Sequence, residues 1–274
     1  MKSIVDNVNA ALSFIRRDFQ IAVSYKSAFF ADVIGILLKV ITFYYIGAVF
    51  GGVVSPSLAA FGGDYFAFLI VGIALTDFVH TSLETFSTSM RDSQMTGTLE
   101  IVLLSPIGVP QLLLYSSLWA YIFTTIRFGI YLLFGAWLFD LDMSQASLSS
   151  ATVILLLTVL CYAPLGIISA AVIMVFKKGT WFRTLVNGAS VLLGGVAYPI
   201  DVLPKWIAAL SYYVPMTHSV SGMRHALLNG RTLGWLWAEV AFLAGFAVIF
   251  IPLSLYVFEL SLNRTKKLGT LTQY

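Results

Sequence analysis

The chain has 274 residues, of which 59% are hydrophobic and only 11% are charged, and its mean hydropathy is +0.89. Soluble domains carry about 25% charged residues and could not bury this much apolar surface, so the composition excludes a water-soluble fold. The formal net charge of +3 gives no sign of a nucleic-acid partner. We therefore expect an all-α integral membrane protein.

The first element in chain order is amphipathic. Apolar residues recur at helical spacing from Ile4 to Val23, and charged or polar residues such as Arg16 fall on the opposite face. This pattern predicts that residues 1–27 form a helix in the cytoplasmic interface of the membrane. The alternative is an ordinary surface helix packed on the rest of the protein.

Five later stretches are apolar over the length of about 20 residues that a transmembrane helix needs. They are residues 28–50, 65–87, 112–139, 151–176 and 235–258. A sixth stretch, 184–198, is short and runs into two glycines and a proline. Lys and Arg favour the cytoplasmic side, and basic connections alternate with connections that lack them. This alternation predicts about six spans within residues 28–258, with a cytoplasmic N-terminus and a cytoplasmic tail at 259–274.

The sequence contains no Gly-Lys dipeptide, and therefore no phosphate-binding loop of the Walker type. It also lacks Gly-x-Ser-x-Gly and His-Glu-x-x-His. Cys161 is the only cysteine, lies in an apolar run, and is expected to be a small packing residue. We expect no catalytic residue, no metal site and no cofactor bound by this chain.

The connection at residues 89–106 is polar at its start and apolar at its end. Thr98 could cap a short helix that Pro106 would stop. Such a helix would lie along the membrane and show charged side chains to the cytoplasm, which suits the docking of a partner. The alternative is a plain interfacial helix. The residues expected in the docking surface are Arg91, Asp92, Gly97, Thr98, Leu99 and Glu100.

The connection at residues 199–230 is apolar and aromatic, yet Pro199, Pro204 and Pro215 prevent a single helix from crossing it. This combination predicts short re-entrant helices that dip into the outer leaflet and cap or line a pathway. Trp206 is expected at headgroup level, and Arg224 lies near the end of the segment.

Charged residues also occur inside the predicted spans, where they are costly and suggest function. Asp77, His80 and Glu84 share one helix face, and Lys39 lies at a depth similar to that of Asp77, so we expect an ion pair between Lys39 and Asp77. Arg127 has no evident partner; it could attract an anionic headgroup or bond carbonyls at a kink. All five residues are candidates for a translocation path, and Asp77, His80 and Glu84 could form a proton relay. Structural pairing, with Glu84 reaching the cytoplasmic interface, is the alternative.

Two motifs resemble the type-2 ABC permease family, the membrane subunits of many bacterial exporters. The run Thr96-Gly97-Thr98-Leu99-Glu100, followed by a Leu-Leu-Ser-Pro sequence, is similar to the family's coupling-helix region. A second, looser pattern of the family is matched by Gly195, Pro199, Leu203, Pro204, Trp206, Pro215, Thr217, Arg224, Leu227 and Gly230.

The resemblance implies an ATP-driven exporter in which two copies of this chain pair with two ATPase subunits. ATP and Mg²⁺ would bind the ATPase, which would dock on residues 89–106. The expected location is a bacterial or archaeal cytoplasmic membrane, with membrane lipid as a further partner, and the expected substrate is a lipid-linked or amphiphilic molecule such as a polysaccharide, glycolipid or drug. The alternative is an ion-coupled secondary transporter that uses Asp77, His80 and Glu84. An intramembrane enzyme fits poorly, because no nucleophile and base form a motif.

Overall fold

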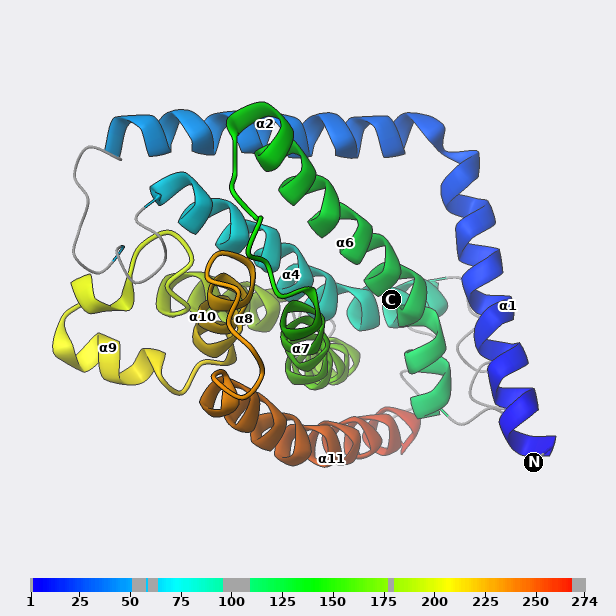
Figure 1. The fold of residues 1–274 in the computed structure, drawn as a ribbon. Helices are drawn as coiled ribbons and strands as arrows, with labels where there is room; N and C mark the ends of the chain where they lie inside the picture. Colours follow the sequence, from blue (N-terminus) through cyan, green and yellow to red (C-terminus); the bar gives the residue numbers. More distant parts are fainter. Residues whose placement is uncertain (1, 51–57, 59–63, 96–108, 177–179, 268–274) are drawn as a thin grey trace.

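The computed structural model describes residues 2–50, 58, 64–95, 109–176 and 180–267 (Figure 1). Within these ranges the regular secondary structure is entirely helical, which confirms the all-α prediction. The helices are α1 (Lys2–Ser24), α2 (Lys26–Phe50), α4 (Tyr65–Met95), α6 (Val109–Phe139), α7 (Leu148–Phe176), α8 (Thr180–Leu193), the 3₁₀ turn η1 (Ile200–Val202), α9 (Lys205–Ser211), α10 (Pro215–Leu227) and α11 (Trp237–Lys267).

Five of the described helices, α2, α4, α6, α7 and α11, are long and apolar enough to cross a membrane. They correspond to the five long stretches predicted above, and they make the chain a multi-pass membrane protein. Helix α8 has 14 residues. At 1.5 Å per residue it is about 21 Å long, which is shorter than the hydrocarbon core of about 30 Å. It therefore matches the short sixth stretch of the sequence.

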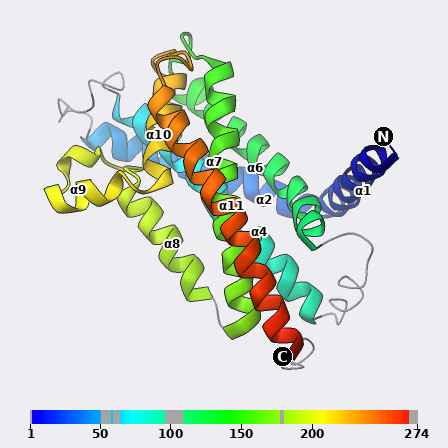
Figure 2. The same cartoon turned by 90° about the horizontal axis from the view of Figure 1, so that it is seen from below.

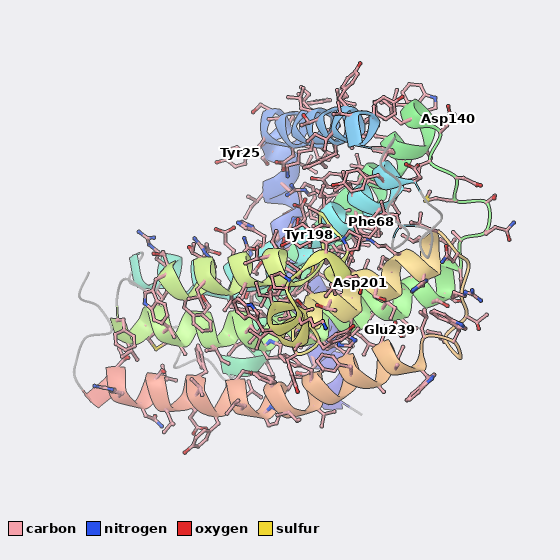
Figure 3. All side chains as sticks on the ribbon, turned by 90° about the vertical axis from the view of Figure 1, so that its left-hand side faces the viewer. Tyr25, Phe68, Asp140, Tyr198, Asp201 and Glu239 are labelled. Carbon is pink, nitrogen blue, oxygen red and sulfur yellow. The ribbon has the colours of Figure 1, made fainter. Side chains whose placement is uncertain are left out.

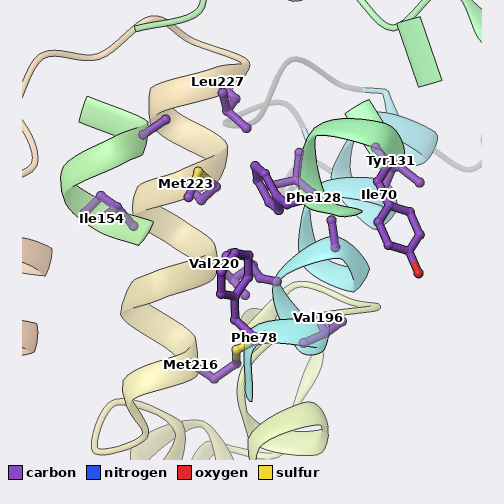
Figure 4. Close-up of a cluster of buried hydrophobic side chains, with 14 of the residues drawn as sticks. Ile70, Phe78, Phe128, Tyr131, Ile154, Val196, Met216, Val220, Met223 and Leu227 are labelled. Atoms are coloured by element: carbon purple, nitrogen blue, oxygen red, sulfur yellow. The ribbon is translucent and has the colours of Figure 1, made fainter. Parts of the chain in front are cut away.

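Helix α4 is the centre of the bundle. Its most apolar window is 78% buried, against 11% for α2 and 17% for α11. Phe78 of α4 packs near Phe128 of α6 and Val220 of α10, and Ile154 of α7 lies on the far side of α10 (Figure 4). Lipid tails are as apolar as these side chains, so close packing rather than exclusion from water holds the helices together.

Small and hydroxyl-bearing residues allow the central helices to approach closely. A Cβ on Gly166 of α7 would collide with the Ser82 carbonyl of α4. The Ser87 hydroxyl donates to Ser169 Oγ over 2.9 Å, which joins α4 to α7, and Thr158 donates to Ser219 Oγ over 2.8 Å, which joins α7 to α10. Such contacts are typical of helix interfaces in membranes, where each is worth about 1 kcal/mol.

The two ends of the bundle differ. Figure 2 shows the C-terminal ends of α4, α7 and α11 on one side, and η1, α9 and α10 toward the other. The single residue Tyr25 separates α1 from α2, so the predicted helix of residues 1–27 ends at Ser24. Helix α4 continues through residues 89–95, and α11 continues to Lys267 through the first part of the predicted tail. The remainder of the 89–106 segment lies outside the described residues.

Candidate functional site: charged face of α4 and the Arg224 clamp

Three charged side chains meet in the middle of the bundle. Asp77 of α4 lies twelve residues after Tyr65 and twelve before Ser89, at the midpoint of its span. Its carboxylate oxygens lie 3.0 Å from an Nη atom of Arg127 on α6 and 3.8 Å from Nζ of Lys39 on α2. One carboxylate thus faces two cations from two neighbouring spans.

A second charged group lies one to two turns further along α4. Glu84 Oε1 accepts a hydrogen bond of 2.8 Å from Nη1 of Arg183 at the start of α8, and Glu84 Oε2 lies 3.2 Å from His80 Nδ1. His80 therefore lies between the Asp77 and Glu84 clusters. Together, the side chains form a continuous polar face on α4, with its counter-charges on α2, α6 and α8.

This face opens into a cavity of about 310 Å³, lined by Lys39, Asp77, His80 and Arg127 together with Thr76, Thr81, Asn187 and Val191. The side chains of His80 and Lys39 are 57% and 47% exposed, whereas that of Asp77 is only 16% exposed. The carboxylate therefore lies at the floor of the cavity, and the two basic side chains lie at its mouth.

Hydroxyl groups continue the polar lining. Lys39 Nζ donates to the Tyr131 hydroxyl over 3.1 Å, and the hydroxyls of Thr81 and Thr124 are 2.9 Å apart. Asp77 Oδ2 and Arg127 Nε are buried, and neither has an aligned hydrogen-bond partner among the described residues. The Asp77–Arg127 contact is thus a charge contact with unused hydrogen-bonding capacity, of the kind that water or a polar ligand satisfies.

The structure brings all five predicted intramembrane residues into this one region. The ion pair between Lys39 and Asp77 is confirmed at 3.8 Å. The expectation that Arg127 has no evident partner is corrected, because Arg127 pairs with the same carboxylate. Arg183 was not among the predicted site residues, yet it is the partner of Glu84. The sequence signal for this pair is depth, because Arg127 also lies near the middle of its span, but depth alone does not show which spans are neighbours.

At the other end of the bundle, Arg224 of α10 holds the break after α8 against α4. Its guanidinium donates to the carbonyl of Phe68 over 2.8 and 3.0 Å, to that of Gly195 over 2.8 Å and to that of Val196 over 2.7 Å. It also lies 3.3 Å from the centre of the Phe68 ring, and the residue is 3% exposed. The fork of N–H donors on arginine suits three carbonyls that a lysine could not reach together.

Gly72 makes this clamp sterically feasible. A Cβ on Gly72 would lie 2.6 Å from the Val196 carbonyl oxygen and 2.7 Å from an Nη atom of Arg224. Gly195 has φ +64°, a conformation that glycine adopts without the steric cost of a side chain. Tyr65 adds a further tie by donating to the Ala197 carbonyl over 2.9 Å. Neither Gly72 nor Tyr65 was identified from the sequence.

A cavity of about 270 Å³ lies beside the clamp, with Arg224, Phe68, Asp201, His218 and Glu239 among its lining residues. Figure 3 labels Phe68, Asp201 and Glu239, which come from α4, η1 and the start of α11. The cavity therefore joins four elements that are far apart in sequence.

The prolines of residues 199–230 separate short elements, as expected from the restricted backbone of proline. Pro199 and Pro204 immediately precede η1 and α9, and Pro215 is the first residue of α10. Trp206 lies on α9 and is largely exposed. The structure thus confirms a broken segment here, while its position relative to the lipid remains a prediction.

Of the predicted docking residues, Arg91 and Asp92 lie in the last turns of α4, and Arg91 is exposed. Gly97, Thr98, Leu99 and Glu100 lie outside the described residues. The structure therefore shows that α4 includes the first part of the predicted docking segment, and the docking itself stays a prediction.

These features define a multi-pass membrane protein with a charged face inside its bundle and a broken, clamped segment at one end. A family model described as "ABC-2 type transporter" matches residues 11–228. The chain belongs to this family, and it is therefore the membrane subunit of an ABC transporter, in which a separate ATPase hydrolyses ATP.

Named relatives agree with this assignment. The chain is 26% identical to Nodulation protein J of Sinorhizobium fredii over 235 residues, which cover 82% of this chain and 85% of that protein. It is 25% identical to Nodulation protein J of Rhizobium leguminosarum bv. trifolii over 76% of this chain and 78% of that protein. It is also 27% identical to the linearmycin resistance permease protein LnrN of Bacillus subtilis, over 45% of this chain and only 32% of that protein. The alternative of an ion-coupled secondary transporter gains no support from these matches.

Proposed function

We propose that the chain is the permease of an ATP-driven exporter that moves an amphiphilic or lipid-linked molecule outward across the cytoplasmic membrane. A separate ATPase docks on residues 89–106, and two copies of the chain form the working transporter. Both termini lie in the cytoplasm in this arrangement. The name of one relative refers to resistance to linearmycin, which supports the outward direction, because removal of a compound is a means of resisting it.

The observation that carries the proposal is the position of the charged face. His80 and Lys39 are about half exposed in the single chain, and Lys39 and Asp77 lie near the middle of their spans. A charged side chain at this depth is costly against lipid tails, so such residues face water or another protein surface. The open side of this cavity therefore supports a polar path completed by a second copy.

Helix α4 also supplies a mechanical connection. It carries Asp77 and Glu84, it receives the Arg224 clamp at its outer end through Phe68, and at Met95 it leads into the docking segment. A displacement of the docking segment by the ATPase would act directly on this helix. We propose that α4 transmits that displacement to the charged cavity and to the outer clamp.

The docking part of the proposal is tested by co-purification with the ATPase subunit from its native host. We expect the wild-type chain to retain the ATPase and Glu100→Arg to lose most of it, with unchanged thermal stability of the chain. Lys205→Glu, a charge reversal at an exposed position of α9 at the opposite end, is the matched control. Full retention of the ATPase by the Glu100→Arg variant would refute docking at this segment.

The path itself is tested by thiol labelling in a Cys161→Ser background, which removes the only cysteine. We expect a water-soluble, membrane-impermeant maleimide to label His80→Cys in the assembled transporter. Val248→Cys, on an exposed apolar position of α11, serves as the lipid-facing control. Equal failure to label both positions would contradict a water-accessible path along α4.

A further inference from the structure

The inner side of the bend between α1 and α2 contains an apolar groove. The two helices meet sharply at Tyr25, and α6 contacts both of them (Figure 1). The groove has a volume of about 370 Å³, and its lining includes Phe19 and Val23 of α1 and Trp119 and Phe123 of α6. Its wall is therefore built mainly from ring and aliphatic surfaces.

The aromatic side chains hold the groove in shape. The rings of Phe19 and Trp119 meet edge to face with centroids 5.4 Å apart, and Trp119 stacks on Phe123 at 6.2 Å. Phe29 of α2 lies 6.3 Å from Phe123. All three helices thus contribute to one preformed wall, which lowers the cost of ordering a flexible apolar chain against it.

Lys26 is the only charged residue on the described lining of the groove. It is exposed, and it is the first residue of α2, next to the bend. Among the described residues, no carboxylate lines the groove. A negatively charged group at the mouth would therefore meet a cation, while the interior accepts only an apolar chain.

We propose that this groove binds an anionic phospholipid of the cytoplasmic leaflet, with one acyl chain along Phe29, Trp119 and Phe123 and the phosphate beside Lys26. The occupant is a lipid because a single molecule must fill the apolar groove and also pair with the cation at the mouth of the groove. In the proposed topology α1 lies in the membrane interface, so the bend lies at the depth of the headgroups. The bound lipid supports the angle between α1 and α2. This inference is independent of the exported substrate.

The test uses Trp119 as a reporter, because phospholipids brominated on the acyl chain quench a tryptophan that they contact. The other five tryptophans, Trp137, Trp181, Trp206, Trp235 and Trp237, are replaced by phenylalanine. The full-length variant is reconstituted into vesicles of phosphatidylglycerol and phosphatidylcholine, in which either lipid carries the bromine. A second reporter retains only Trp137, which is exposed near the other end of the same helix.

We expect brominated phosphatidylglycerol to be preferred at Trp119 about fivefold over brominated phosphatidylcholine, which corresponds to about 1 kcal/mol for one lysine near an anionic headgroup. Lys26→Gln removes this preference, and high salt weakens it. At Trp137 the two lipids quench equally. Ala22→Phe, which fills the groove from α1, lowers the quenching of Trp119 by both lipids without changing that of Trp137.

Three results would overturn the proposal. The first is equal quenching of Trp119 by the two lipids, and the second is a preference that survives Lys26→Gln. The third is the absence of Trp119 quenching by either lipid in the reporter that retains Lys26. That result would mean that a second copy of the chain or another protein covers the groove. Circular dichroism and gel filtration of each variant distinguish these results from unfolding.

Discussion

Replacement of Arg224 by methionine removes a clamp while preserving an apolar side chain of similar length. The carbonyls of Gly195 and Val196 then lose the only donors that the described residues supply to them. A buried carbonyl without a donor costs about 1–3 kcal/mol, and the lost contacts to Phe68 add about 1 kcal/mol, as interhelical hydrogen bonds in membranes do. We expect a loss of roughly 3–7 kcal/mol in stability, or a fall in Tm on the order of 10 °C.

Cys161 provides the assay. It is fully buried, and its thiol donates to the Leu243 carbonyl over 3.1 Å, so a dye that fluoresces on reaction with thiols reports the opening of α7 from α11. Arg224→Lys keeps the charge but cannot reach three carbonyls, and we expect about half of the loss. Lys205→Met is the control for removal of an exposed cation. A Tm of Arg224→Met within about 2 °C of the wild-type value would refute the clamp.

Further substitutions test the geometry at Gly72, at the Asp77–Arg127 pair and at Arg183. Gly72→Ala places a Cβ 2.6 Å from the Val196 oxygen, so we expect overpacking to lower the stability by about 1–3 kcal/mol. In the double variant with Arg224→Met the two losses of stability are less than additive, because both substitutions act on one contact. Strict additivity in the thermal assay would contradict this. Asp77→Asn leaves Lys39 and Arg127 without their shared counter-charge, and we expect a loss of about 1–3 kcal/mol, because the carboxylate is largely buried and the lysine half exposed. Exchange of the charges in Asp77→Arg with Arg127→Asp recovers at least half of the stability lost in Asp77→Arg alone; no recovery would argue against the pair. Arg183→Met releases Glu84 and lowers Tm by only a few degrees, since both side chains are partly exposed, and a fall as large as that of Arg224→Met would contradict this ranking.

The spans could be predicted because the thickness of the bilayer imposes a minimum length on each apolar helix. The break after α8 could also be predicted, since Gly194, Gly195 and Pro199 are residues that end helices. The partner of Arg127 could not be assigned, because depth alone does not say that α6 lies beside α4 at Asp77. Depth in the membrane therefore limits the possible ion-pair partners of a charged residue, and the neighbouring helices determine which partner it has.

The Arg224 clamp could not be predicted from the sequence, for a different reason. Arg224 binds backbone carbonyls, which have no side-chain signature, and the need for glycine at position 72 arises only from the approach of Val196 to α4. The boundary between α1 and α2 was similarly hidden, because nothing at Tyr25 resembles a helix stop. In these places tertiary contact, not local preference, determines the structure.

The central claim is that this chain provides the membrane passage and that ATP is hydrolysed on a separate subunit. The most direct measurement is ATP hydrolysis by the purified chain in lipid vesicles, alone and after addition of the ATPase that co-purifies with it. The account predicts no ATP hydrolysis by the chain alone and ATP hydrolysis by the complex. It also predicts that the Glu100→Arg variant no longer assembles with the ATPase. Hydrolysis of ATP by the purified chain without a partner would contradict it.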